Sequence, residues 1–165
     1  MRTETEKKDS SGKPKKQFCT FWLSGRLYGV DILDVKEVNQ EARFTNVFHA
    51  PKQVKGLVNI RGRIHLILDL HRILGFEVRE QRGESRLVLF KPSVGESFGV
   101  LVDGIGDVIE VEERLIESGE LADRDVTGGE EGADVHELIS SVCRLEETLL
   151  LIINARNLLK VTEKN

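Results

Sequence analysis

The side chains that could carry out chemistry are few, and their spacing does not match that of a known reaction site. Gly104-Ile105-Gly106 lacks the third glycine of a dinucleotide-binding loop, and the strand-like residues after it stand where that motif needs a helix. Asp123-Arg124-Asp125 begins like a calcium loop but lacks the later ligands. The four histidines and two cysteines have no metal-ligand spacing. We therefore expect no cofactor, no metal and no enzymatic activity.

An internal duplication organises the elements of the chain. Tyr28-Gly29-Val30 is matched seventy positions later by Phe98-Gly99-Val100. A longer block, from Leu57 to Leu74, is matched eighty-five positions later, and an insertion accounts for the larger offset. A repeat of this length indicates two similar supersecondary units. Because the matched positions are mostly apolar, the repeat favours a double binding module over an enzyme.

The local patterns predict strands far more often than helices. Short apolar runs between glycine turns predict strands at residues 18–23, 27–32, 56–60, 63–70, 86–90, 97–103 and 148–153. Helical pieces are expected only at residues 70–74 and 155–162, after the last strand of each copy. Short strands at this spacing favour small closed barrels, which leave few exposed strand edges. The 165 residues suffice for one large domain or two small fused ones.

The net charge of −4 is unevenly distributed. Residues 1–16 contain six basic and three acidic side chains, which predicts a disordered basic tail. Residues 110–137 contain eleven acids and two arginines, a net −9, and predict an acidic, mobile insertion. The rest of the chain carries +2, and residues 161–165 are expected to form a short tail. An acidic chain without a dense basic face is not typical of a nucleic-acid binder.

Cysteine usage and hydropathy indicate the cellular compartment in which the protein is expected. Cys19 and Cys143 lie inside apolar runs and form no CxxC pair, as expected of reduced core residues in a cytoplasmic protein. No run of about 18 uncharged apolar residues is present and the N-terminus is polar, so we expect neither a membrane span nor a secretory signal.

One block of residues carries a resemblance to a known family. Gly56-Leu57-Val58-Asn59-Ile60-Arg61-Gly62, followed seven residues later by Asp69-Leu70, is its most specific element. With the duplicated Tyr28-Gly29-Val30 region, it resembles the CheW family of bacterial chemotaxis coupling proteins over residues 17–160. The resemblance implies an all-β fold of two five-stranded SH3-like barrels. It also implies a non-catalytic cytoplasmic adaptor that couples the regulatory domain of a CheA-type histidine kinase to the cytoplasmic tip of chemoreceptors in membrane-associated arrays.

The resemblance also implies two sets of contact residues. The receptor-binding set comprises Val35, Glu37, Val38, Gly56, Asn59, Arg61 and Gly62. The kinase-binding set comprises Val88 and Val108. A groove lined by valines would accept the apolar stripe of an amphipathic helix, with charged residues at its rim fixing the register. For the valines the alternative is ordinary core packing, and for Arg61 it is a turn arginine that hydrogen-bonds the backbone.

Several positions depart from the family pattern and keep other functions open. They are Phe48-His49, Leu66, Ser140-Ser141 and Asn154. The departures are compatible with a divergent coupler that serves a non-motility pathway or binds only one of the two partners. A function of another class, nucleic-acid binding by a double SH3-like barrel, would require a steep salt dependence that the acidic composition disfavours.

Overall fold

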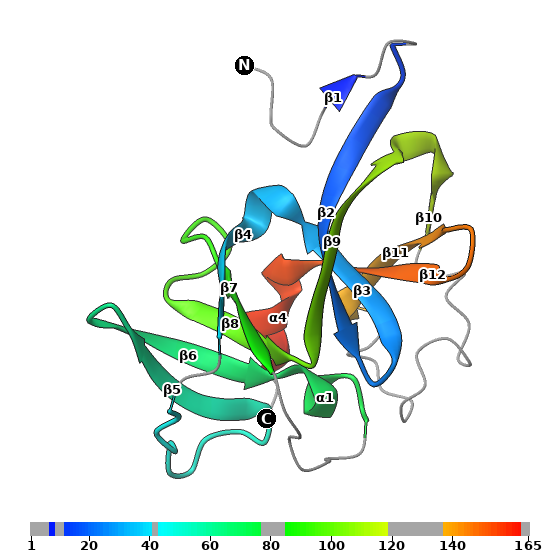
Figure 1. The fold of residues 1–165 in the computed structure, drawn as a ribbon. Coiled ribbons are helices and arrows are strands. Elements are labelled where there is room, and N and C mark those ends of the chain that lie inside the picture. Colours follow the sequence, from blue (N-terminus) through cyan, green and yellow to red (C-terminus); the bar gives the residue numbers. More distant parts are fainter. Residues whose placement is uncertain (1–6, 9–11, 41–42, 77–84, 119–136, 163–165) are drawn as a thin grey trace.

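The computed structural model describes residues 7–8, 12–40, 43–76, 85–118 and 137–162, whose strands form two sheets that lie side by side (Figure 1). The first sheet has the order β1-β2-β3-β12-β11-β10, with β9 also paired to β2. Its strands are β1 (Lys7–Lys8), β2 (Pro14–Leu23), β3 (Arg26–Asp31), β9 (Gly104–Glu112), β10 (Ile116–Ser118), β11 (Ile139–Arg144) and β12 (Leu149–Ile153). We call this sheet the first barrel.

The second sheet has the order β4-β7-β8-β6-β5 and forms the second barrel. Its strands are β4 (Val35–Gln40), β5 (Val54–Ile60), β6 (Arg63–Asp69), β7 (Arg86–Phe90) and β8 (Phe98–Val102). Short helical segments join or follow the strands: η1 (Ile32–Asp34), α1 (Leu70–Ile73), η2 (Glu113–Leu115), η4 (Ala155–Asn157) and α4 (Leu158–Thr162). The prediction of an all-β, two-barrel fold with a short C-terminal helix is confirmed, as are helical pieces after β6 and β12.

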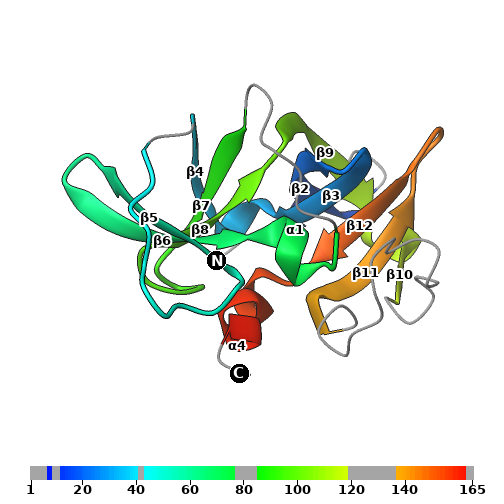
Figure 2. The same ribbon diagram turned by 90° about the horizontal axis from the view of Figure 1, so that it is seen from below.

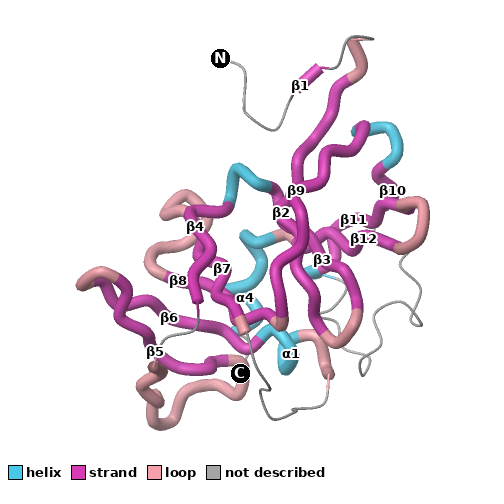
Figure 3. The backbone as a smooth tube through the Cα atoms, viewed as in Figure 1, coloured by secondary structure: helices cyan, strands magenta, loops and turns pink. Residues whose placement is uncertain are grey.

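The two sequence repeats are interleaved, so neither barrel is built from one repeat alone. In the first barrel, β3 of the first repeat pairs in parallel with β12 of the second repeat. In the second barrel, β6 of the first repeat pairs in parallel with β8 of the second. Figure 3 shows the strands of each barrel arriving from distant parts of the chain. The two similar units indicated by the repeat therefore do not form one barrel each.

The strand register reproduces the duplication residue by residue. Gly29 lies opposite Ile152 in one parallel pair, and its repeat equivalent Gly99 lies opposite Ile67 in the other. Ile67 and Ile152 are themselves eighty-five positions apart, which is the offset of the second matched block. Each equivalent pair therefore occupies the same place in its barrel, and positions can be compared directly between the two barrels.

The largest buried cluster is shared by the two barrels. It contains Phe21 and Tyr28 from the first barrel, Phe90 and Phe98 from the second, and Leu158 from α4. Each barrel also has a smaller interior cluster, around Cys143 in the first and around its equivalent Val58 in the second. Figure 2 shows α4 beneath the junction of the two sheets. Because apolar burial is the main stabilising term, this shared cluster holds the barrels together as one unit.

Polar contacts reinforce the junction. Asp103, which follows β8, accepts a hydrogen bond from the Ser24 backbone N–H (2.9 Å) and lies 3.1 Å from Nε2 of His71. Arg156 in η4 donates from Nη1 to the Ser93 carbonyl oxygen (2.8 Å) and pairs with Asp34 at 3.8 Å. Burial raises the pKa of the Asp34 carboxyl, and the neighbouring Asp31 adds to the effect. These contacts link elements of both barrels.

Two predicted segment boundaries change. Strand β2 begins at Pro14, and Lys7–Lys8 pair with Lys15 and Pro14, so part of the predicted basic tail belongs to a sheet. The first part of the predicted acidic insertion, residues 110–118, forms the end of β9, η2 and β10. The rest of that insertion, residues 119–136, lies outside the described residues.

Candidate functional site

The turn between β5 and β6 presents an arginine in an unusual backbone conformation. Arg61 and Gly62 both have positive φ, 51° and 83°, as in the two-residue turns that favour Asn-Gly. The Asn59 side-chain oxygen accepts a hydrogen bond from the Gly62 N–H at 2.9 Å and stabilises the turn. A non-glycine residue at positive φ costs conformational energy, which often marks a functional position. The backbone conformation of the turn therefore does not by itself favour an arginine at position 61.

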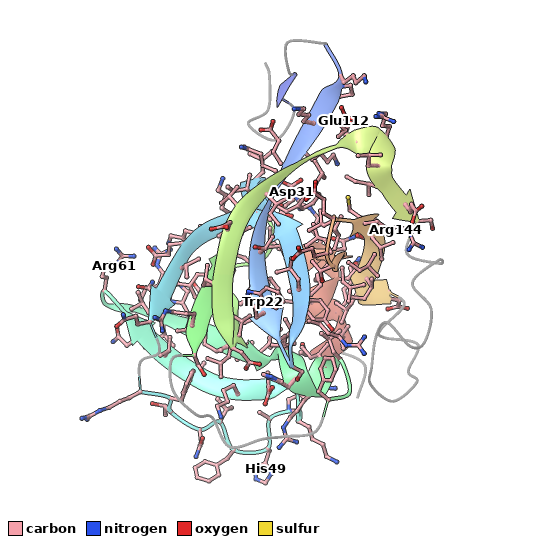
Figure 4. The ribbon with its side chains drawn as sticks, turned by 45° about the vertical axis from the view of Figure 1, so that its right-hand side comes forward. Trp22, Asp31, His49, Arg61, Glu112 and Arg144 are labelled. Carbon is pink, nitrogen blue, oxygen red and sulfur yellow. The ribbon has the colours of Figure 1, made fainter. Side chains whose placement is uncertain are left out.

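The Arg61 guanidinium pairs with Glu37 on β4. In the sheet order, β4 is the edge strand opposite to β5, which leads into the turn. Asn39 donates from its side-chain nitrogen to the other Glu37 carboxylate oxygen at 2.8 Å. The hydrogen bond from Arg61 is the main cause of the lowered pKa of Glu37, with Asn39 adding to it, so the carboxylate stays ionised. Figure 4 shows Arg61 extending from the tip of the hairpin. The predicted rim charges thus form one ion pair that stands at the surface.

Two exposed aliphatic side chains lie on the strands that carry or adjoin this pair. Val38 follows Glu37 on β4 and is 39% exposed, and Ile64, opposite Asn59 in the hairpin, is 52% exposed. Val35 is instead half-buried and packs against the shared core, so core packing accounts for it. Gly56 is buried, and a Cβ atom there would lie 2.8 Å from the Thr45 carbonyl oxygen. Its position in the hairpin is a structural requirement.

The two residues predicted to contact a kinase have different environments. Val88 in β7 has no exposed surface and belongs to the shared core, so it offers no surface to a partner and that part of the prediction is wrong. Its neighbours Leu87, Leu89 and Phe90 are also buried, and an uninterrupted apolar run of this kind indicates a strand covered on both faces. Val108 in β9 is 53% exposed and remains available for binding.

The duplication relates the exposed residues around Val38 to those around Val108, and the two sets differ in charge. Val38 and Val108 are equivalent, seventy positions apart, and both are exposed. Glu37 corresponds in the same way to Asp107, whereas Arg61 corresponds, with the offset of eighty-five, to Glu146. The face on the second barrel therefore carries an ion pair, and the corresponding positions of the first barrel are both acidic. One fold presents two surfaces of different charge.

The contribution of two residues was not predicted from the sequence. Asn39 hydrogen-bonds the Glu37 carboxylate, and Ile64 is an exposed aliphatic residue of the hairpin that carries Arg61. Alternation along β4 places Asn39 on the same side as Glu37, which is a usable sequence signal. No comparable signal exists for Ile64, because an aliphatic residue in an apolar strand is ordinarily read as core.

Among the described residues, no group of three or more His, Cys, Asp or Glu side chains could hold a metal ion. Cys19 and Cys143 are free and buried, and burial raises the pKa of both thiols. A buried thiol with a raised pKa is a poor nucleophile. In the part of the chain that the structure describes, every helix is too short or too polar to cross a bilayer.

Comparison with known proteins identifies the family. The family model described as "CheW-like domain" matches residues 17–163. The chain belongs to the CheW-like family. This CheW-like chain is 28% identical over 148 residues to the "Chemotaxis protein CheW" of Klebsiella aerogenes, covering 89% of this chain and 83% of that protein. It is also 28% identical over 147 residues to the Bacillus subtilis protein of the same name, covering 89% and 88% of the two chains.

A solved structure of the family has the same fold as this CheW-like chain. The crystal structure of scaffolding protein TtCheW from Thermoanaerobacter tengcongensis matches with a TM-score of 0.71 and 25% identity, covering 84% of this chain and 88% of that one. Together these findings support a chemotaxis adaptor role, that of a scaffold without catalytic chemistry.

Proposed function

We propose that this chain couples the regulatory domain of a CheA-type histidine kinase to the cytoplasmic tip of chemoreceptors, as a cytoplasmic adaptor recruited to receptor arrays. The observation that carries the proposal is the chemical difference between two equivalent faces. Val38, the residue after Glu37 in β4, is exposed on the second barrel, which also carries the Glu37–Arg61 pair, and Val108, the residue after Asp107 in β9, is exposed on the first barrel. A bridging protein needs two separate contact surfaces with different preferences, and exposed, chemically different residues at equivalent positions of the two barrels support this assignment.

The face on the second barrel is assigned to the receptor. Its exposed aliphatic residues, Val38 and Ile64, suit the apolar stripe of an amphipathic helix. The Glu37–Arg61 pair offers one charge of each sign, which sets register and partner choice more than affinity. Asn59 and Gly62 support the receptor contact by holding the turn that presents Arg61. Val35 and Gly56 contribute by keeping β4 and β5 in place.

The face on the first barrel is assigned to the kinase. Val108 is exposed, and its strand β9 pairs on one side with β2. Among the described residues no other strand pairs with β9. Because the two faces lie on different barrels, occupation of one leaves the other open.

The test measures each partner separately by calorimetric titration. Val38→Asp should weaken receptor-tip binding by roughly 30-fold or more, since it buries an unpaired charge, while kinase-domain binding stays unchanged. Val108→Asp should give the reverse result. Leu115→Asp is the matched control, because Leu115 is 46% exposed but lies in η2 and not in β4 or β9. If either valine variant weakened both interactions equally, the assignment of one face to each partner would be wrong.

The ion pair permits a further distinction. Arg61→Glu should lower receptor coupling and leave the fold intact, because the Arg61 side chain is 70% exposed. The double variant Glu37→Arg with Arg61→Glu restores the pair with its polarity reversed. Recovery of binding would show that the partner requires an ion pair of either polarity. Continued loss would show that it requires the original charge at each of the two positions.

A further inference from the structure

The loop between β4 and β5 carries positive charge that is not balanced by nearby acids in the sequence. From position 43 to position 68 the chain contains five lysine and arginine residues and no aspartate or glutamate. Over the whole chain acidic residues outnumber basic ones, 28 to 24. Arg43 and Lys52 in the loop are exposed, and neither forms an ion pair with another residue that the structure describes. The loop therefore presents uncompensated positive charge to the solvent.

A second basic stretch, at the start of β2, is neutralised by acids from the neighbouring elements. Lys15 lies 3.6 Å from Glu110, and Lys16 lies 4.0 Å from Glu113. Figure 4 shows Glu112, between these two acids in the sequence, at the upper end of the molecule, whereas His49 of the loop lies at the lower edge. The positive charge of the loop is thus not offset by acids in the way that the positive charge of β2 is.

A tight turn projects a phenylalanine from the loop. The Ala50 N–H donates to the Val47 carbonyl oxygen at 3.4 Å and closes a four-residue turn with Phe48 and His49 at its centre. His49 has a φ of 63°, a conformation that favours glycine and that recurs at functional positions. Phe48 is 89% exposed and Val47 is 40% exposed. The turn therefore presents two apolar side chains to the solvent.

A second turn follows at once and carries Lys52. The Val54 N–H donates to the Pro51 carbonyl oxygen at 3.0 Å. Reciprocal backbone hydrogen bonds of 2.8 Å between Thr45 and Leu57 anchor the start of the loop on β5, beneath which it lies in Figure 1. These hydrogen bonds give the loop a defined shape. We call its exposed cations and apolar residues, Arg43, Val47, Phe48 and Lys52, the basic loop surface.

A protruding aromatic ring between cations fits the surface of an anionic membrane. Aromatic side chains favour the headgroup level of a bilayer, and lysine and arginine are attracted by the negative potential of an anionic leaflet. A stable protein contact would bury about 800 Å² on each partner, whereas the exposed apolar residues of this loop are confined to one turn. Single-stranded nucleic acid would require several aromatic rings for base stacking, and Phe48 is the only exposed Phe, Tyr or Trp in residues 43–53.

We infer that the basic loop surface docks this chain on membranes that contain anionic phospholipids. The side chains of Phe48 and Val47 enter the headgroup layer, and Arg43 and Lys52 lie against the lipid phosphates. This surface is separate from the ion pair on the same barrel, because Figure 4 places His49 away from Arg61.

The experiment is co-sedimentation of the full chain with vesicles of phosphatidylcholine that contain about one third phosphatidylserine. The chain should pellet with these vesicles at about 0.05 M salt and should not pellet with vesicles of phosphatidylcholine alone. Raising the salt to about 0.5 M should weaken binding by roughly tenfold or more, since exposed charges are then screened. Absence of binding at low salt, or equal binding to both kinds of vesicle, would overturn the inference.

Variants assign the binding to the loop. The double variant Arg43→Glu with Lys52→Glu should bind at least about 25-fold more weakly, since each cation near an anionic leaflet contributes roughly fivefold. Phe48→Ser should bind roughly tenfold more weakly and leave the fold intact, because the side chain is exposed. Arg144→Glu is the matched control for charge: its side chain is 77% exposed on the first barrel, and it should bind within about twofold of the unmodified chain.

Fluorescence distinguishes entry of the loop into the headgroup layer from electrostatic contact alone. Phe48→Trp adds a fluorophore to the loop, whereas Trp22, the only natural tryptophan, lies in β2. Emission of the variant should shift to shorter wavelength with anionic vesicles, and emission of the unmodified chain should stay constant. Loop variants that bind vesicles like the unmodified chain, or an unchanged emission of Phe48→Trp, would overturn the inference. Loop-dependent binding to an oligonucleotide or to polyglutamate in place of vesicles would also overturn it, by identifying a different occupant.

Discussion

Gly99 is the position where a single added methyl group should damage the fold most clearly. It lies in β8, between β7 and β6. A Cβ atom there would lie 2.4 Å from the Val88 carbonyl oxygen and 3.2 Å from the Leu89 Cα, both of them backbone atoms of β7. Backbone cannot move away by changing a rotamer, so β8 must shift relative to β7. Overpacking of this kind costs about 1–3 kcal/mol, and the backbone clash places Gly99→Ala at about 3 kcal/mol.

The assay is thermal unfolding followed by circular dichroism. For a chain of this size 1 kcal/mol corresponds to about 2–4 °C, so Gly99→Ala should lower the Tm by about 6–12 °C. Gly104→Ala is the control, because a Cβ atom there meets nothing within 4 Å and the backbone conformation is ordinary. It should leave the stability unchanged or raise it by about 0.4–1 kcal/mol. Equal Tm values for the two variants would refute the close packing of β8 against β7.

Three further predictions concern titratable groups. Tyr28→Phe should raise the free energy of unfolding by about 1 kcal/mol in urea denaturation, because the buried Tyr28 hydroxyl has no partner among the described residues. The equivalent position of the second repeat already carries a phenylalanine, Phe98. Burial raises the pKa of Tyr28, the only tyrosine, to about 12, so ultraviolet titration of the folded chain should show no phenolate near pH 10. Since the unfolded chain ionises near pH 10, stability should fall as the pH rises from about 10 to about 12, and a native midpoint near 10 would contradict this. Arg61 lowers the pKa of Glu37 below 4.5, so the ion pair stabilises the folded chain at neutral pH, and this contribution is lost as the pH falls through the lowered pKa. Arg61→Asn should raise the titration midpoint of the Glu37 carboxyl measured by NMR.

Much of the fold follows from local patterns in the sequence. The Arg61-Gly62 turn, the strands on either side of it and the helical pieces after Asp69 and Asn154 were predicted correctly. Asp69 and Asn154 are repeat equivalents, and each accepts a backbone hydrogen bond in the helical turn that follows it. These features depend on short-range chemistry, which the sequence displays directly.

The interleaving of the repeats could not be predicted in the same way. A repeat shows which segments are alike, but it does not show which segments pair, since Ile67 could have joined either Gly29 or Gly99 on local grounds. The choice is made by the packing of all strands around the shared core.

The site was predicted in part for a related reason. A valine in an apolar strand has the same local pattern whether it faces the core, as Val88 does, or a partner, as is proposed for Val38. The Glu37–Arg61 contact joins a residue of β4 to a residue of the β5–β6 turn, 24 positions apart. Their proximity depends on barrel closure, which no local pattern encodes.

The measurement that tests the central claim most directly is the mass of a three-component complex. The chain would be mixed with the regulatory domain of a CheA-type kinase and with a receptor tip fragment from the same genome, and analysed by size-exclusion chromatography with light scattering. Two separate faces predict one species that contains all three proteins, with Val38→Asp losing only the receptor fragment. Displacement of one partner by the other would contradict the account, because it would mean that both compete for a single face.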